Sequence, residues 1–169
     1  RIVTMDGDLP MAVAGQSVTL TFDDEIDCSR GDVIAIADAP PMVADQFEST
    51  LVWMDETALL PGRNYIMKIG TQTVEASVQS LKYQINVNNT EHLAVKTLAL
   101  NDIGVVEIGT TRPIVFEAYG DNRDLGGFIL IDKMSHATIA AGMLHFSLRR
   151  AQNVHWQASD IDRQAHAAQ

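Results

Sequence analysis

The stretch DNRDLGGFILIDKMSHATIAAG, residues 121–142, decides the fold predicted for this chain. After its glycine pair, the side chains alternate between two faces of an extended strand. One face carries Phe128, Leu130 and Asp132, and the other carries Ile129, Ile131 and Lys133. Apolar residues on both faces indicate a strand deep in a barrel, and the turn that begins at Asp132 leads into a second apolar run. The stretch therefore predicts a β-hairpin in the wall of a barrel.

Strand patterns of the same kind recur along the rest of the chain. Residues 16–22, QSVTLTF, alternate with the period of two that a half-buried antiparallel strand requires. We predict strands over residues 16–22, 33–37, 47–54, 65–70, 72–87, 104–119, 126–133 and 139–150. Short strands separated by turn residues describe a sandwich or a barrel. The predicted fold class is therefore all-β and antiparallel.

Two proline residues mark a boundary between domains. Pro40 and Pro41 cannot donate to a strand ladder, so we divide the chain into residues 1–42 and 43–157. The last residues, SDIDRQAHAAQ, place Ser159 three positions before Asp162, the spacing of a helix capping box. We predict a helical linker over residues 158–169. Because the chain begins with Arg1 instead of Met, we take it to be a piece of a longer protein.

The composition limits the classes of function. The 169 residues are 46% hydrophobic and 20% charged, which is typical of a globular chain that can bury a core. The formal net charge is −10 and the Lys and Arg residues are scattered, which argues against a nucleic acid partner. No stretch has the length of a membrane span. The single cysteine, Cys28, excludes an internal disulfide and fits a reducing, cytoplasmic location.

The sequence contains none of the common motifs of catalytic or metal sites. The five histidines, at positions 92, 136, 145, 155 and 166, show no helical ligand spacing and have no cysteine pair beside them, so we predict no metal site. Cys28 lies among acidic residues that disfavour a thiolate nucleophile. Gly31, within Arg30-Gly31-Asp32, supplies backbone freedom at a strand entry. Asp55 and Glu56 read as a solvated loop, and no phosphate-binding loop is present. We predict no catalytic or cofactor-binding residue in this chain.

The remaining candidates are structural or interface residues. Asp121, Asn122, Arg123 and Asp124 place both charge signs before Gly126 and Gly127. An arginine flanked by carboxylates can form charge-assisted hydrogen bonds, and the two glycines allow the backbone to turn or to approach another segment closely. We favour a scaffold or interface role over a catalytic one. Trp156 is a further candidate anchor, whereas Trp53 is assigned to the core.

Several strings carry a resemblance to a known family. They are residues 44–88, ADQFESTLVWMDETALLPGRNYIMKIGTQTVEASVQSLKYQINVN; residues 98–108, LALNDIGVVEI; residues 121–132, DNRDLGGFILID; and residues 142–157, GMLHFSLRRAQNVHWQ. These resemble the C-terminal part of the large subunit of bacterial sulfate adenylyltransferase. Residues 14–35, AGQSVTLTFDDEIDCSRGDVIA, resemble the closing half of the second domain of such GTPases. The tail resembles the bridge to an adenylylsulfate kinase domain in bifunctional forms.

The resemblance implies a fold and a role. It implies an antiparallel Greek-key β-barrel of the elongation-factor domain 3 type over residues 43–157, preceded by part of a domain 2 barrel in residues 1–42. The parent enzyme would couple GTP hydrolysis to the formation of adenylyl sulfate and pyrophosphate from ATP and sulfate. GTP, ATP and Mg would bind outside this chain, which would contact its own missing GTPase domain and the small catalytic subunit.

Two alternatives remain open. The barrels could belong to a translation GTPase and bind tRNA, although the charge of −10 argues against this reading. The chain could also be a free-standing module whose loops form a pocket for a small molecule.

Overall fold

The computed structural model describes residues 1–150, excluding the side chains of the last two of these residues. They fall into two compact units, residues 1–29 and residues 30–150. The first barrel strand begins at Met42, so residues 30–41 precede the barrel within the second unit. The predicted domain ranges stay predictions, and the predicted linker over residues 158–169 and Trp156 lie outside the described residues. Within residues 1–150, no helix has the length and apolar character needed to span a membrane.

The first unit is a small sheet. Strands β1 (Ile2–Thr4), β2 (Gly7–Leu9) and β3 (Thr19–Leu20) pair in the order β2-β1-β3. The Arg1 guanidinium, which precedes β1, bonds Asp8 of β2 at 2.5 Å. The strand predicted over residues 16–22 is reduced to the two residues of β3. None of residues 1–29 is fully buried, so the sheet lacks the apolar burial that extends strands.

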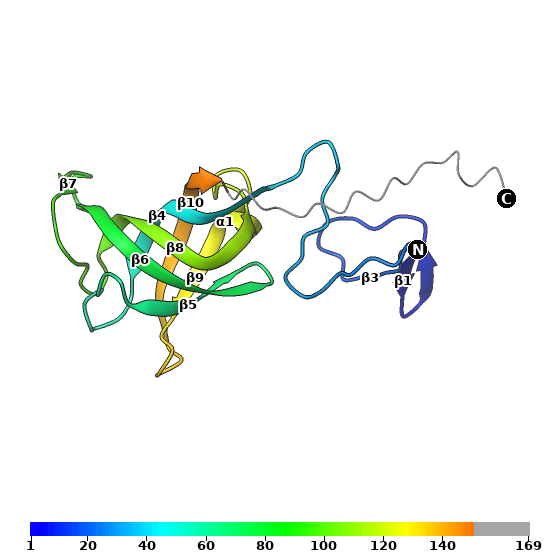
Figure 1. Ribbon diagram of the computed structural model, residues 1–169, viewed down its shortest axis with the longest axis horizontal. Helices are drawn as coiled ribbons and strands as arrows, with labels where there is room; N and C mark the ends of the chain where they lie inside the picture. Colours follow the sequence, from blue (N-terminus) through cyan, green and yellow to red (C-terminus); the bar gives the residue numbers. More distant parts are fainter. Residues whose placement is uncertain (151–169) are drawn as a thin grey trace. The chain divides into compact units, whose positions relative to one another are not determined.

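The second unit is a closed barrel of six strands, drawn in cyan to orange in Figure 1. Its strands are β4 (Met42–Trp53), β5 (Asn64–Ile69), β6 (Gln72–Ile85), β8 (Ile103–Phe116), β9 (Gly127–Ile131) and β10 (Thr138–Arg150). They follow the order β5-β9-β10-β4-β8-β6, every pair is antiparallel, and the β5–β6 pairing closes the wall. The short strand β7 (His92–Leu93) extends β6. This order is a Greek key, and the predicted all-β antiparallel barrel is confirmed.

The barrel interior follows the alternation seen in the sequence. In β4, Phe47, Ser49, Leu51 and Trp53 point inward and are at most 2% exposed, and the alternate residues between them are half-buried. In β9, Phe128, Leu130 and the Asp132 that follows are buried, so they form the inward one of the two faces that the alternation separates. Phe47 of β4 packs edge-on against Phe116 of the neighbouring strand β8, with ring centroids 4.8 Å apart. These inward rows form one apolar core.

One glycine makes room for a ring in this core. A Cβ on Gly142 of β10 would lie 2.1–2.6 Å from three ring atoms of Phe128, which faces it in β9. The missing side chain therefore allows Phe128 to lie flat against the wall. Barrel interiors combine large and small residues in this way to fill a tapering space.

One prediction about the chain path was wrong, and one short helical element was not predicted. Residues 33–37, VIAIA, form no strand, and Ile34 and Ile36 are 63% and 75% exposed. β-branched residues favour a strand only where a neighbouring ladder and a buried face are available. The stretch before the β9 hairpin, for which no element was predicted, is helical: α1 (Arg123–Gly126) is one turn placed between β8 and β9.

Candidate functional site

The predicted cluster at residues 121–124 forms the start of α1. The backbone N–H groups of Asp121 and Asn122 both donate to the Ala118 carbonyl oxygen at 2.9 Å. The Asn122 side chain caps the helix, since its Oδ1 accepts from the N–H groups of Asp124 at 3.0 Å and Leu125 at 3.3 Å. Within residues 1–150 no ion pair joins Arg123 to Asp121 or Asp124, and the Arg123 guanidinium lies 5.9 Å from the ring centre of Tyr119. The cluster therefore fixes a chain reversal and leaves exposed charges at its surface.

The glycine pair allows a close backbone approach. A Cβ on Gly126 would lie 2.4 Å from the Tyr119 backbone nitrogen and Cα, and a Cβ on Gly127 would lie 2.9 Å from the Arg123 carbonyl oxygen. Both contacts are with backbone atoms, which cannot rotate away as a side chain can. Glycine is therefore required where α1 crosses the end of β8.

Gly31, Cys28 and Trp53 do not belong to this cluster. Gly31 has a φ of +107° and packs against Gln72, which explains the glycine, although no strand follows it. Cys28 is exposed and forms no disulfide. Trp53 is 2% exposed, as its assignment to the core predicts, and its Nε1–H donates to the Thr57 carbonyl oxygen at 2.8 Å.

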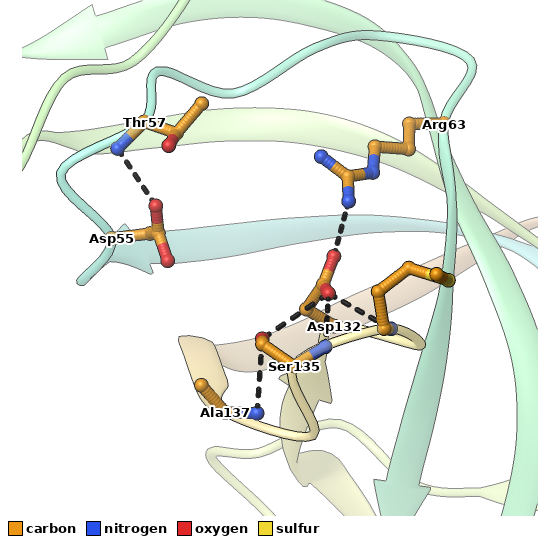
Figure 2. A network of polar contacts seen from close by, with 7 residues as sticks. Asp55, Thr57, Arg63, Asp132, Ser135 and Ala137 are labelled. Atoms are coloured by element: carbon orange, nitrogen blue, oxygen red, sulfur yellow. Dashed lines mark hydrogen bonds and ion pairs between the residues drawn. The ribbon is translucent and has the colours of Figure 1, made fainter.

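A polar pocket lies at one end of the barrel and was not predicted. It has a volume of about 270 Å³ and is lined by Trp53, Asp55, Thr57, Ala58, Arg63, Tyr65, Asp132, Ser135 and Ile139. Figure 2 shows the Arg63 guanidinium, from the loop before β5, pointing at the Asp132 carboxylate at the end of β9. The ion pair thus joins the loop after β4 to the β9–β10 hairpin. Arg63 and Asp132 are 69 positions apart, so no local pattern indicates the pair.

Asp132 is held by its own turn as well as by Arg63. Its Oδ1 accepts from the backbone N–H groups of Met134 and Ser135, both at 2.9 Å, and from the Ser135 hydroxyl at 3.2 Å. These backbone N–H groups, with Arg63 as a smaller contribution, hold the pKa of Asp132 below its usual value. An aspartate followed three residues later by a serine is a turn signal that the sequence does contain.

The other pocket walls are aromatic and acidic. Tyr65 and Trp53 meet edge to face with ring centroids 6.1 Å apart, and burial raises the pKa of Tyr65. Asp55 Oδ1 accepts from the Thr57 N–H at 2.7 Å, which closes the turn after β4 (Figure 2). The contacts of these polar groups hold the loops after β4 and after β9 against the barrel, which supports a structural role for the pocket.

A second polar network crosses the outside of the barrel. Lys82 Nζ of β6 lies 2.7 Å from Glu48 Oε2 of β4 and 3.3 Å from Glu107 Oε1 of β8. His145 of β10 continues the network, with Nδ1 3.3 Å from Glu48 Oε1. The hydrogen bond from Lys82 lowers the pKa of Glu48, and the same bond raises the pKa of Lys82. We call Glu48, Lys82, Glu107 and His145 the polar wall.

A family match covers most of the barrel. The model of the family described as GTP-eEF1A C-terminal domain-like matches residues 46–145. The solved structure of sup35 complexed with GMPPNP superposes with a TM-score of 0.62 at 22% identity, covering 78% of this chain and 32% of that one. This likeness concerns the fold, and it agrees with the predicted elongation-factor type of barrel.

Curated relatives match almost the whole chain. The bifunctional enzyme NodQ of Rhizobium sp. (strain N33) is 50% identical over 99% of this chain and 26% of its own length. The bifunctional enzyme CysN/CysC of Xylella fastidiosa (strain Temecula1) is 50% identical over 99% of this chain and 27% of its own length. Sulfate adenylyltransferase subunit 1 of Aeromonas hydrophila is 39% identical over 98% of this chain and 39% of its own length. The predicted resemblance is confirmed, and the chain spans about a quarter of the length of the bifunctional relatives.

Proposed function

Because this chain belongs to the GTP-eEF1A C-terminal domain-like family, we propose that it is the barrel region of a sulfate-activating GTPase. In the parent, GTP hydrolysis would be coupled to the reaction of ATP with sulfate to give adenylyl sulfate and pyrophosphate. This region would be a non-catalytic scaffold and subunit interface. The observation that carries the proposal is the match to sulfate adenylyltransferase subunit 1 and to two bifunctional enzymes over at least 98% of the chain.

The proposal assigns the cofactors and partners to other parts of the assembly. GTP, ATP and Mg would bind in the parent's remaining domains and in the small catalytic subunit, in the cytoplasm. The similarity to enzymes named bifunctional supports an adenylylsulfate kinase domain in the same polypeptide. The barrel would contact both its own GTPase domain and the small subunit.

The closed wall suits a scaffold on physical grounds. Each of the six strands is paired on both sides, so the barrel has no free edge and deforms little. A rigid body of this kind passes a rearrangement from one neighbour to the next as a rigid-body shift. Loops tied by Arg63–Asp132 and by the Asn122 cap keep the ends of the barrel fixed.

The non-catalytic part of the proposal is tested by titration of the 169-residue chain with labelled GTP in the presence of Mg. We expect no saturable binding, whereas the full-length protein should bind GTP. Saturable binding in the micromolar range by the 169-residue chain would place a nucleotide site within it and overturn the proposal.

The interface part is tested at the exposed charge of α1. In the full-length protein, we expect Arg123→Glu to weaken capture of the small subunit or to lower the melting temperature, because Arg123 lies against Tyr119. Lys96→Glu, an exposed charge reversal outside α1, is the control. Unchanged capture together with unchanged melting would remove both roles from Arg123.

A further inference from the structure

The pocket at the end of the barrel keeps a space open between the loops that line it. Its volume is about 270 Å³, just below the range of roughly 300–1,000 Å³ that is typical of pockets for drug-sized ligands. Figure 2 shows Asp55 and Arg63 on the loop after β4, and Asp132 at the start of the β9–β10 hairpin, around this space. A volume of this size suits a ligand as large as one long amino-acid side chain.

The two carboxylates of the pocket differ in how many of their oxygens are bonded. Asp132 uses Oδ1 for its own turn and Oδ2 for Arg63. Asp55 Oδ1 accepts from the Thr57 N–H at 2.7 Å, whereas within residues 1–150 Asp55 Oδ2 has no hydrogen-bond or ion-pair partner. An ionised carboxylate can only accept hydrogen bonds, so a ligand that meets Asp55 Oδ2 must donate one.

The charges of the pocket favour a cation. Two carboxylates and one guanidinium line it, those of Asp55, Asp132 and Arg63, which gives a net charge of −1. The lowered pKa of Asp132 keeps this carboxylate charged and paired with Arg63 at neutral pH, so the unbalanced charge is that of Asp55. Lys133 does not line the pocket and is paired with Glu75 at 2.6 Å. An ammonium or guanidinium group is therefore attracted to the pocket and an anion is repelled.

The other walls suit the hydrocarbon part of a basic side chain. Apolar surface is contributed to the lining by Trp53, Ala58, Tyr65 and Ile139. Lysine and arginine pack their methylene stems along apolar surface and place the charge at a polar end. Such a stem can lie against these four residues while its head reaches Asp55.

The two loops that line the pocket also carry exposed apolar side chains. Met54 and Leu60 of the loop after β4 are 41% and 53% exposed, and Met134 of the β9–β10 hairpin is 85% exposed. A free amine in the pocket would leave these side chains in water, whereas a polypeptide that lies across the loops would cover them. Methionine adapts its shape to a binding partner, and a basic anchor surrounded by apolar contacts is typical of an interface hot spot.

We propose that this pocket binds an arginine or lysine side chain of a partner protein, with the cationic head at Asp55 and the stem against the apolar walls. The net charge of −10 on the chain supports a partner with a basic surface, since complementary charges bring two proteins together faster. The inference goes beyond the proposed function, because a scaffold role does not require this pocket to bind anything.

The first test measures binding of blocked amino acids to the 169-residue chain by NMR titration. N-acetyl-arginine amide is the cationic probe, N-acetyl-citrulline amide has nearly the same shape without the charge, and N-acetyl-glutamate amide carries the opposite charge. The signals to follow are the Thr57 amide and the Trp53 indole N–H, which belong to residues of the pocket lining. We expect saturable shifts with the arginine probe in the millimolar range and none with the other two.

This first comparison needs no variant, so it decides the question even where a variant fails to fold. Equal binding of the citrulline probe would overturn the inference, because the pocket would then not recognise charge. Binding of the glutamate probe alone would overturn it as well and would assign the pocket to Arg63 as an anion site. Absence of binding by all three probes would have the same consequence.

The second test changes the charge of the pocket. Asp55→Asn removes the negative charge and keeps an oxygen that can accept from the Thr57 N–H, and we expect it to weaken binding of the arginine probe by about tenfold or more. Glu56→Gln is the matched control, since Glu56 is an exposed neighbour that does not line the pocket, and it should change the affinity less than about twofold. Melting curves confirm that both variants are folded. Equal affinities of a folded Asp55→Asn variant and wild type would contradict the inference.

Two further measurements identify the source of the cation. A blocked Leu-Arg-Leu tripeptide should bind about tenfold more tightly than the single arginine probe, because its leucines can cover Met54, Leu60 and Met134. Equal affinities would reject a partner protein and assign the pocket to a free amine. The arginine probe should also bind the full-length protein, as measured by saturation-transfer NMR. Loss of binding there would overturn the inference in favour of a basic side chain from the same polypeptide.

Discussion

Ser49 places a hydroxyl inside the apolar core of the barrel. Its side chain is 0% exposed, and its Oγ has no hydrogen-bond partner among residues 1–150. A buried polar group without a partner lowers stability because its bonds to water are lost on folding. We expect Ser49→Ala to raise the free energy of unfolding by about 1 kcal/mol, measured by urea denaturation. Ser80→Ala is the control with the opposite sign, since Ser80 Oγ donates to Glu107 at 2.8 Å.

The Gln72 side chain forms the two hydrogen bonds to the Val115 backbone that a paired strand would otherwise form. Its Nε2 donates to the Val115 carbonyl oxygen at 2.8 Å and its Oε1 accepts from the Val115 N–H at 3.0 Å, and Gln72 is 4% exposed. We expect Gln72→Leu to lower the free energy of unfolding by about 2 kcal/mol or more, because both Val115 groups lose their partner. Gln84→Leu, a half-buried glutamine of the same strand, should change it by less than about 0.5 kcal/mol. A similar loss in both variants would contradict this reading.

For single residues, the sequence indicates which side chains share a face of a strand better than it indicates which side chains bond to each other. The alternation in β9 places Phe128, Leu130 and Asp132 on one face because period two is a local property, but it does not say that this face is the inward one. It cannot reveal the bond of Asp132 to Arg63, because the loop and the hairpin meet only when the barrel closes. The Gln72 bond to Val115 is hidden for the same reason.

Among the elements, α1 depends on the closeness of its backbone to the end of β8. We expect Gly126→Ala to lower the free energy of unfolding by about 2 kcal/mol or more, and with it the melting temperature. The reason is that the new Cβ would meet backbone atoms of Tyr119. Gly120→Ala is the matched control, since nothing lies within 4 Å of its Cβ position and we expect no shift. Equal melting of both variants would show that α1 can move away.

The barrel strands were predictable, including the short β5 and β9, whereas β1, β2, β7 and α1 were not predicted. β4, β6, β8 and β10 carry long runs of β-forming residues between turn signals, and each lies close to its predicted range. Residues 33–37 have the same composition but no neighbouring strand, so propensity alone does not make them a strand. The single turn of α1 begins at the Asn122 cap. Asparagine is a common helix start, but in this sequence it lies within a polar run that equally suits a turn.

For the whole molecule, acid stability follows from the carboxylates that the fold holds charged. The pKa of Asp132 is lowered, so above the ordinary aspartate value of about 3.9 the charged form stabilises the folded state. This contribution is lost as the pH falls through the lowered pKa. We expect Asp132→Asn to melt lower than wild type near neutral pH and the difference to shrink below pH of about 3.9. Melting curves across the acid range measure it, and a gap that stays constant with pH would contradict it.

A second carboxylate with a lowered pKa lies on the polar wall. Glu48 also has a lowered pKa, and its main partner is Lys82. We expect Glu48→Gln to show the same narrowing on acidification. Asp124→Asn, which changes an exposed carboxylate of α1, is the control: at each pH it should melt as wild type does. If Asp124→Asn removed the dependence of the melting temperature on acid pH, that dependence would have to be assigned to exposed surface charge instead of to Asp132 and Glu48.

The Greek-key order also decides when this barrel can form on the ribosome. β4 is the first wall strand to be made, yet its two neighbours, β8 and β10, are among the last, and β10 ends at Arg150. The β5–β6 hairpin is complete early, while β4 waits with both sides open through the synthesis of most of the wall. Because pairing of distant segments is slow, nascent chains that stall before β10 expose β4 to chaperones and to other nascent chains.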